Sequence, residues 1–153
     1  MKSLSNILIY LSFLGNAGDQ ILFSNKQDIR RFNFGLQNYT LVLGGLEYVR
    51  SLDYDYKEGK LFFISLQNNE KTIIQSTSFV NQNAKPNVVV DTMTQLDNDL
   101  KSLCVDWLTK KIYYTDLDRK RVEVANYDGT WTRVIVSTGL IQPEGLALFP
   151  QKG

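Results

Sequence analysis

The chain has 153 residues, of which 43% are hydrophobic and 12% aromatic, so it has enough apolar material for one folded domain and too many aromatic residues for a disordered protein. Seventeen basic and sixteen acidic residues leave a net charge of +1, and nothing resembles the basic stripe of a nucleic-acid-binding protein. The chain has no histidine and one cysteine, which removes the usual parts of most hydrolytic, zinc and redox sites. We therefore expect no enzyme, no cofactor and no bound metal ion.

The N-terminal residues have the features of a secretory signal peptide. Lys2 gives a basic start, residues 4–14 are mostly apolar, and residues 15–17 include the small side chains that a signal peptidase reads. The apolar run is too short to span a membrane. We expect a signal peptide at residues 1–17; the alternative is a buried first strand.

A mature chain of residues 18–153 would then be secreted, or would form part of a plasma-membrane ectodomain. Asn38 begins an Asn-Tyr-Thr triplet, which is an acceptor for N-linked glycosylation and fits this route. No segment of the chain is expected to cross a membrane.

Short runs of alternating apolar and polar residues, separated by turn residues, predict β-strands throughout the mature chain. Between two of the runs, Asp128 and Gly129 form a turn pair, because glycine tolerates a positive φ and aspartate bonds back to its own backbone. In chain order the expected strands are Gln20 to Ser24, Asp28 to Phe32, Tyr39 to Leu43, Arg50 to Tyr54, Lys60 to Ser65, Thr72 to Thr77, Asn87 to Asp91, Ser102 to Asp106, Lys111 to Asp116, Arg121 to Asn126, Thr132 to Ser137 and Gly145 to Phe149.

The strands repeat. Residues 51–56 line up with residues 102–107, and residues 61–63 with residues 112–114, while Gly145 and Leu146 restart the pattern. Repeats of roughly 40 to 50 residues with four strands each are propeller blades. We therefore predict an all-β fold, a partial β-propeller of about three four-stranded antiparallel blades, with blade fragments 20–43, 50–91 and 102–137 and an opening strand at 145–149.

Residues 112–116, Ile-Tyr-Tyr-Thr-Asp, resemble the YWTD motif of the low-density lipoprotein receptor class B repeats, with Tyr114 in the tryptophan position. Residues 21–30 and 45–47 are most similar to the first propeller of the Wnt co-receptors within that superfamily. The resemblance implies a six-bladed propeller in which motif aromatics wedge between blades and the Thr-Asp pair supports repeated hydrogen bonds. Further positions that match the family are Asp106, Trp107, Tyr113, Thr115, Asp116, Gly129 and Gly145.

The middle blade departs from this pattern. Residues 62–65, Phe-Phe-Ile-Ser, keep the apolar half of the motif and lose the threonine and the aspartate. We therefore expect the middle blade to be tied less firmly to its neighbours.

The resemblance also implies a function: binding of secreted protein ligands, Wnt or antagonists with Asn-X-Ile-type segments, on one face of the propeller. Lys26 stands where the family has the arginine of that face, so the planar guanidinium fork is replaced by a point charge. Glu70 falls close to the acidic loop residue of the family. The other residues of that pocket belong to blades outside this chain, so closing the propeller requires those blades or a second chain.

Two other functions compete with this hypothesis. A propeller of an endocytic lipoprotein-type receptor would release its ligand on acidification, but the lack of histidine removes the usual switch. A secreted propeller enzyme of the lactonase kind would need the histidine and calcium ligands that the sequence lacks. Asp53 and Asp55 suggest a carboxylate pair, but Asp55 matches Asp106 and is better explained as a repeated turn residue.

Two points concern the physical state of the chain. Cys104, on an innermost strand, is expected to be a buried small hydrophobe rather than a reactive thiol. An arc of blades has two open edges, which leaves three possibilities: a truncated product that aggregates, a half-ring that pairs with a second chain, or a chain that continues beyond this sequence.

Overall fold

The computed structural model describes residues 20–68, 71–79, 85–91 and 99–150. The expected signal peptide at 1–17 and the candidate ligand residue Glu70 lie outside these ranges. The described residues form eleven strands and no helix, and none of them contributes a helix long and apolar enough to cross a membrane. The all-β class predicted from the sequence is confirmed.

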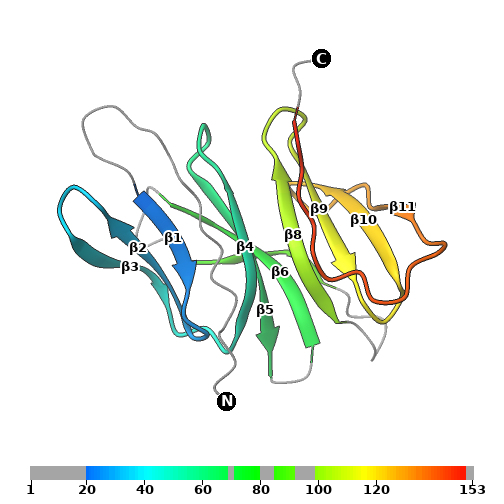
Figure 1. The fold of residues 1–153 in the computed structure, drawn as a ribbon, viewed down its shortest axis with the longest axis horizontal. Helices are drawn as coiled ribbons and strands as arrows, with labels where there is room; N and C mark the ends of the chain where they lie inside the picture. Colours follow the sequence, from blue (N-terminus) through cyan, green and yellow to red (C-terminus); the bar gives the residue numbers. More distant parts are fainter. Residues whose placement is uncertain (1–19, 69–70, 80–84, 92–98, 151–153) are drawn as a thin grey trace.

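The strands form three antiparallel sheets that fan out side by side (Figure 1). Each sheet follows the chain order, as expected for consecutive blades: β1-β2-β3, then β4-β5-β6-β7, then β8-β9-β10-β11. We call them the first, middle and third blade. The strands are β1 Gln20–Ser24, β2 Asp28–Asn33, β3 Asn38–Gly44, β4 Val49–Asp55, β5 Lys60–Gln67, β6 Lys71–Ser78, β7 Asn87–Val90, β8 Leu100–Asp106, β9 Lys111–Asp116, β10 Arg121–Asn126 and β11 Arg133–Val136.

Two hydrophobic seams hold the blades together. The seam between the first and middle blades contains Leu22 and Ile29 on one side and Leu52, Leu61 and Phe63 on the other. The seam between the middle and third blades is built in the same way, and its buried residues are Phe62, Ile64, Ile74, Val90, Leu100, Leu103, Val105, Ile112, Tyr114, Ala125 and Tyr127. Adjacent residues of one strand point to opposite faces, so the neighbours Phe62 and Phe63 contribute one ring to each seam.

Side-chain oxygens of the middle blade also accept hydrogen bonds from the backbone of β8. Ser51 Oγ accepts from the Leu103 amide at 3.1 Å, Asp53 Oδ2 from the Val105 amide at 2.7 Å, and Thr72 Oγ1 from the Leu100 amide at 2.8 Å. The expectation that the middle blade is weakly tied is therefore wrong on its β8 side. The bonds that replace the Thr-Asp pair come from strands β4 and β6 rather than from the motif strand.

The predicted opening strand at Gly145 to Phe149 is not a strand. The segment instead runs along the third blade, where Cys104 Sγ donates to the Leu146 carbonyl at 3.1 Å and Thr115 Oγ1 to the Glu144 carbonyl at 3.4 Å. It therefore docks on β8 much as β8 docks on β4. The ladder that defines a strand is missing because no described strand lies on its other side.

The repeated aspartates close turns. Asp55 Oδ1 accepts from the amides of Lys57 and Glu58 at 2.9 and 3.1 Å, and Asp106 Oδ1 accepts from those of Leu108 and Thr109 at 3.0 and 3.2 Å. This is the geometry by which aspartate initiates a turn. The interpretation of Asp55 as a turn residue is correct, but the turn is only part of its role.

Candidate functional site

Lys26 lies in the turn between β1 and β2, at the lower edge of the molecule in Figure 1. Its φ of 56° is in the left-handed region, and the side chain is exposed. The Lys26 carbonyl accepts a hydrogen bond from the Val49 amide at 2.7 Å, so β4 holds the turn in place. The ammonium lies 5.9 Å from the centre of the Tyr48 ring, within the range of a cation–π contact.

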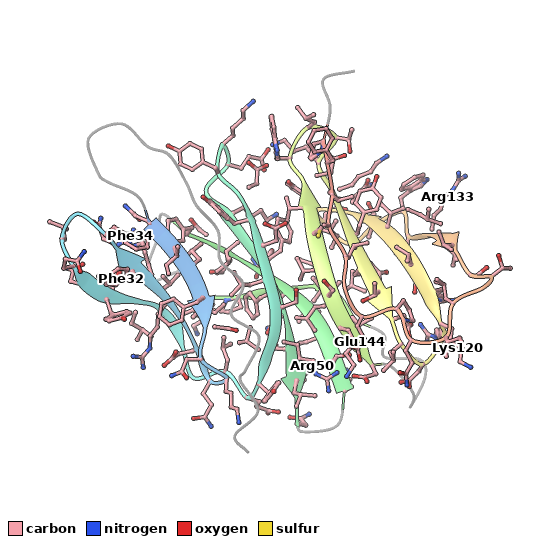
Figure 2. The ribbon with its side chains drawn as sticks, viewed as in Figure 1. Phe32, Phe34, Arg50, Lys120, Arg133 and Glu144 are labelled. Atoms are coloured by element: carbon pink, nitrogen blue, oxygen red, sulfur yellow. The ribbon has the colours of Figure 1, made fainter. Side chains whose placement is uncertain are left out.

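The connections that end at this edge are joined by polar contacts. Glu47 Oε1 accepts from the Asn68 amide at 2.9 Å, which links the β3–β4 connection to the end of β5. Arg50 pairs with Asp99, and Lys101 Nζ lies 3.0 Å from the other oxygen of the same carboxylate. Burial lowers the pKa of the Arg50 guanidinium, and the charges of Tyr48 and Asp118 oppose this shift. Figure 2 shows Arg50, Lys120 and Glu144 along this edge.

We call this edge, with the β1–β2 and β9–β10 turns and the β3–β4 connection, the Lys26 face. On this face the Lys26 ammonium lies beside the ring of Tyr48. This arrangement suits a ligand in which a polar group stands next to an aliphatic side chain. Lys71 Nζ pairs with Asp91 at 2.9 Å, and Lys101 and Arg50 pair with Asp99. Among the described residues, no carboxylate forms an ion pair with the Lys26 ammonium.

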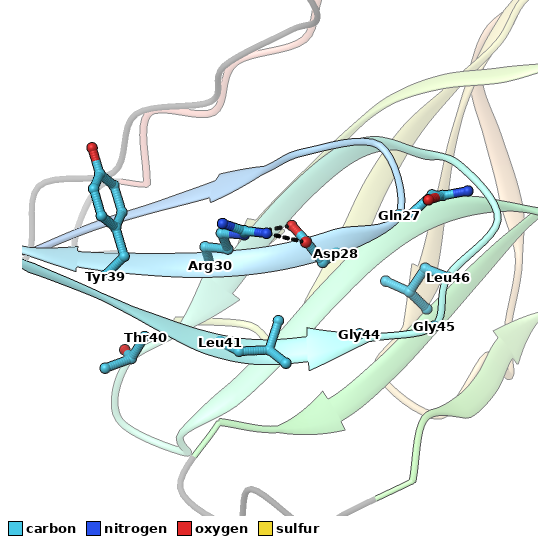
Figure 3. Close-up of a pocket in the computed structure, with 9 residues that line it drawn as sticks. All are labelled: Gln27, Asp28, Arg30, Tyr39, Thr40, Leu41, Gly44, Gly45 and Leu46. Carbon is cyan, nitrogen blue, oxygen red and sulfur yellow. Dashed lines mark hydrogen bonds and ion pairs between the residues drawn. The ribbon is translucent and has the colours of Figure 1, made fainter.

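A hollow of about 640 Å³ opens on the side of the first blade (Figure 3). Asp28 and Arg30 line it and form a two-pronged ion pair, with Arg30 Nε donating at 3.0 Å and Nη2 at 2.7 Å. Asp28 raises the pKa of the Arg30 guanidinium. Because Ile29 between them is buried in the first seam, the hollow lies on the face turned away from the middle blade.

The motif residues lie inside the third blade. Tyr114 is 2% exposed in the second seam, and burial followed by the Glu123 charge raises the pKa of its hydroxyl. Thr115 Oγ1 accepts from the Ser102 amide at 3.0 Å, and Asp116 Oδ1 accepts from the Arg119 amide at 3.0 Å. These three residues make contacts within the fold rather than presenting groups to a ligand.

The other family-matched positions differ in what surrounds them. Tyr113 is half-buried, and Trp107 is partly buried beneath the Lys57 ammonium, which lies 4.4 Å from its ring. Gly129 has a φ of 81°, and a Cβ there would collide with the Val89 carbonyl of the middle blade. A Cβ at Gly145 would meet nothing within 4 Å, so no packing constraint requires a glycine there.

The opposite edge contains a polar cluster that the sequence did not reveal. Asp55 is fully buried, and its Oδ2 accepts from Lys110 Nζ at 2.6 Å and from the Tyr127 hydroxyl at 3.0 Å. Burial alone would raise the pKa of Asp55, but the hydrogen bonds from Lys110, the Glu58 amide and Tyr127 outweigh it and lower the pKa. The sequence pattern places Lys110 only near a turn, because no local pattern links two residues on different blades.

Cys104 lies on β8, and Asn38 is the first residue of β3. Burial, followed by the Asp53 charge, raises the pKa of the Cys104 thiol to about 11, so it is a weak nucleophile at neutral pH. Asn38 is exposed at the start of β3. Thr40, the third residue of its triplet, accepts a hydrogen bond from Arg31 Nε at 3.1 Å. The asparagine is therefore accessible from the outside of the first blade.

Comparisons with known proteins agree with this fold. No family model matches the chain. Low-density lipoprotein receptor-related protein 5 is 33% identical in the mouse and 34% identical in the human, over 90% of this chain. The chain spans 8% of the length of each of these relatives.

Among solved structures, a chain of the nidogen/laminin complex aligns with a TM-score of 0.68 and 22% identity, over 81% of this chain and 46% of that chain. An auxiliary nutrient binding protein from Bacteroides thetaiotaomicron aligns with a TM-score of 0.66 and 13% identity, over 88% and 31% of the two chains. Identities this low establish the fold alone. Together with the YWTD-like repeat and the two seams, these similarities show a partial β-propeller that is similar to low-density lipoprotein receptor-related protein 5.

Proposed function

We propose that the Lys26 face binds a secreted protein ligand outside the cell, either a Wnt or a Wnt antagonist with an Asn-X-Ile-type segment. The observation that carries the proposal is the position of Lys26: exposed, in a turn that β4 holds in place, and beside the ring of Tyr48. The similarity to a lipoprotein receptor-related protein supports a receptor role. Glu70, outside the described residues, is proposed as the acidic member of the same face.

The chemistry of the face suits such a segment. An ammonium donates hydrogen bonds to the amide oxygen of an asparagine, and an adjacent ring offers an apolar surface for the isoleucine two residues on. A lysine supplies one flexible donor group where an arginine would supply a planar fork. We therefore expect weaker binding than a propeller with arginine at this position would give.

Charge reversal at Lys26 tests the proposal. We expect Lys26→Glu to weaken binding of an Asn-X-Ile peptide at least about tenfold, equivalent to about 1.4 kcal/mol, and Lys26→Arg to strengthen it. Biolayer interferometry with the immobilised peptide measures both effects. The control is Lys57→Glu, at an exposed lysine in the β4–β5 turn on the opposite edge of the molecule. Equal losses in the two charge reversals, or no binding of the unmodified chain at micromolar peptide, would reject the proposal.

We also propose that the chain is not an enzyme. Asp53 and Asp55 are the carboxylates whose spacing suggested a catalytic pair. Asp53 accepts from the Val105 and Tyr54 amides, each at 2.7 Å, and Asp55 is engaged by Lys110, Tyr127 and its own turn. Both are therefore committed to the fold. Turnover of an ester substrate in the presence of calcium would contradict this proposal.

Glycosylation at Asn38 would support an extracellular location. We expect the protein secreted from animal cells to lose mass on treatment with an N-glycosidase, and Asn38→Gln to migrate at the treated position without treatment. The exposed side chain at the start of β3 offers the accessibility that the modification needs. Identical migration of the unmodified protein and Asn38→Gln, both untreated, would show that the asparagine carries no glycan.

A further inference from the structure

Both tryptophans of the chain lie on the edge opposite the Lys26 face, in turns of the third blade. Trp107 begins the β8–β9 turn, and Trp131 lies in the β10–β11 turn, where it is 46% exposed. Figure 2 shows Arg133, which follows this turn, on the upper side of the molecule, away from Arg50 and Lys120. We call this edge, with the β4–β5, β8–β9 and β10–β11 turns, the tryptophan edge.

Cations lie against both indole rings. The Lys57 ammonium is 4.4 Å from the centre of the Trp107 ring. The Lys111 ammonium and the Arg133 guanidinium carbon are 4.6 and 5.0 Å from the centre of the Trp131 ring. Such a contact orients a cation but does not neutralise its charge.

The carboxylates of the tryptophan edge are engaged by other groups. Asp55 and Glu58 both pair with Lys110. Asp106 and Asp128 accept hydrogen bonds from amides and hydroxyls of their own turns. Within the described ranges, none of the three cations that lie against the indoles forms an ion pair with a carboxylate. The edge therefore presents positive charge together with exposed indole surface.

The turn that carries Trp131 is fixed against the middle blade. The Asn126 amide donates to the Thr130 carbonyl at 3.0 Å, and a Cβ at Gly129 would collide with the Val89 carbonyl. Trp131 has a φ of 53°, in the left-handed region that is costly for a residue other than glycine. Backbone strain of this kind is concentrated at functional sites, and here it holds an indole ring at the surface.

We propose that the tryptophan edge binds a sulfated glycosaminoglycan, a linear polyanion found outside cells. Each sulfated sugar combines an anionic group with the apolar face of its ring, which matches a cation next to an exposed indole. An acidic peptide carries its charges on flexible side chains and offers no such rigid apolar face. The proposal shares the extracellular location with the proposed function but does not depend on which ligand binds the Lys26 face.

The spacing of the cations suits a long ligand. Lys57 lies in the β4–β5 turn of the middle blade, while Lys111 begins β9 and Arg133 begins β11 of the third blade. Successive sulfates of one chain can therefore contact two blades at once. Each exposed charge contributes little alone, so binding depends on several contacts together.

Binding of the purified full chain to immobilised heparin tests the proposal. We expect the unmodified chain to bind and the affinity to fall as NaCl is added, because salt screens exposed charges. Lys57→Glu/Arg133→Glu should bind at least about fivefold more weakly. The matched control, Lys26→Glu/Lys120→Glu, changes the net charge equally on the opposite edge and should bind within about twofold of the unmodified chain. Circular dichroism checks that each variant is folded.

Tryptophan fluorescence locates the contact without a variant. Because both tryptophans lie on this edge, heparin should change the emission of the unmodified chain, whereas an Asn-X-Ile peptide bound at the Lys26 face should leave it unchanged. The two proposals therefore fail separately. A heparin response without peptide binding would reject only the ligand of the Lys26 face, and peptide binding without a heparin response would reject only the glycosaminoglycan site.

Further results would also overturn the glycosaminoglycan proposal. One is no binding of heparin by the unmodified chain at about 0.15 M NaCl, the physiological ionic strength. Equal weakening in the two double variants would show that net charge alone attracts heparin. Equally tight binding of desulfated heparin would remove the role of the sulfates. Tighter binding of polyglutamate than of heparin would assign the edge to an acidic protein segment instead.

Discussion

Replacing Gly129 with alanine is expected to destabilise the fold by roughly 3 to 5 kcal/mol, since a strained left-handed backbone costs about 1 to 3 kcal/mol and an overpacked contact a similar amount. The φ of Gly129 is 81°, and its Cβ would strike the Val89 carbonyl and approach the Val89 carbonyl carbon to 2.8 Å. The clash lies between the middle and third blades, where neither backbone yields easily. A loss of this size is a large part of the stability of an ordinary domain.

Two other glycines separate the cost of the left-handed backbone from the cost of the contact with Val89. Gly139 has a φ of 74°, and a Cβ added there would meet nothing within 4 Å, whereas Gly145 has the same open space and no positive φ. Urea denaturation should therefore rank the three alanine variants, with Gly145→Ala near the unmodified protein, Gly139→Ala lower by about 1 kcal/mol, and Gly129→Ala lowest. If Gly129→Ala matched Gly139→Ala, the contact with Val89 would contribute nothing.

Asp55→Asn is expected to cost roughly 2 to 4 kcal/mol at neutral pH, because it breaks a buried charged network whose lysine is partly solvated. The two Asp55 oxygens serve different donors: Oδ1 accepts from two backbone amides, and Oδ2 accepts from Lys110 Nζ and the Tyr127 hydroxyl. An asparagine has one oxygen, so its amino group must face one pair of donors in either orientation. The matched control is Asp106→Asn, at the equivalent but more exposed turn, with an expected loss below about 1 kcal/mol.

The pH dependence follows from the lowered pKa of Asp55. A carboxyl group whose pKa is lower in the folded state stabilises the fold above its unfolded pKa, near the ordinary value of 3.8, and this stabilisation disappears as the pH falls through the folded value. Chemical denaturation should therefore show a full gap between the unmodified protein and Asp55→Asn at pH 7, and a narrower one below about pH 4. A gap that stayed constant down to pH 2 would show that the charge of Asp55 is not the cause.

Local patterns in the sequence are sufficient to place the strands. Alternation in each blade fixes where a strand begins and ends, so β1, β9 and β10 have the predicted bounds. The error at Gly145 to Phe149 has the same origin, because alternation reports an extended segment and only a neighbouring strand makes it part of a ladder.

Contacts between blades could not be predicted in this way. From its spacing, Asp53 suggests only a carboxylate pair with Asp55, yet its partner, the Val105 amide, lies 52 positions along the chain. The repeat position of Asp55 identifies it as a turn residue, while its ion pair with Lys110 spans 55 positions. For the candidate site, resemblance indicated Lys26, but the neighbouring ring of Tyr48 emerged only from the way the β3–β4 connection folds back on the β1–β2 turn.

The side-chain oxygens of Ser51, Asp53 and Thr72 accept hydrogen bonds from β8. These bonds affect the order in which the blades unfold. Each sheet is held by its nearest neighbours, so cooperativity depends on how strongly adjacent units couple, as in other tandem-repeat proteins. These three hydrogen bonds couple the middle blade to the third blade. We therefore expect the amides of these two blades to exchange together, as one cooperative unit, in native-state hydrogen exchange. The amides of β1, β2 and β3 should open first, at a lower free energy, and leave the remaining eight strands protected together.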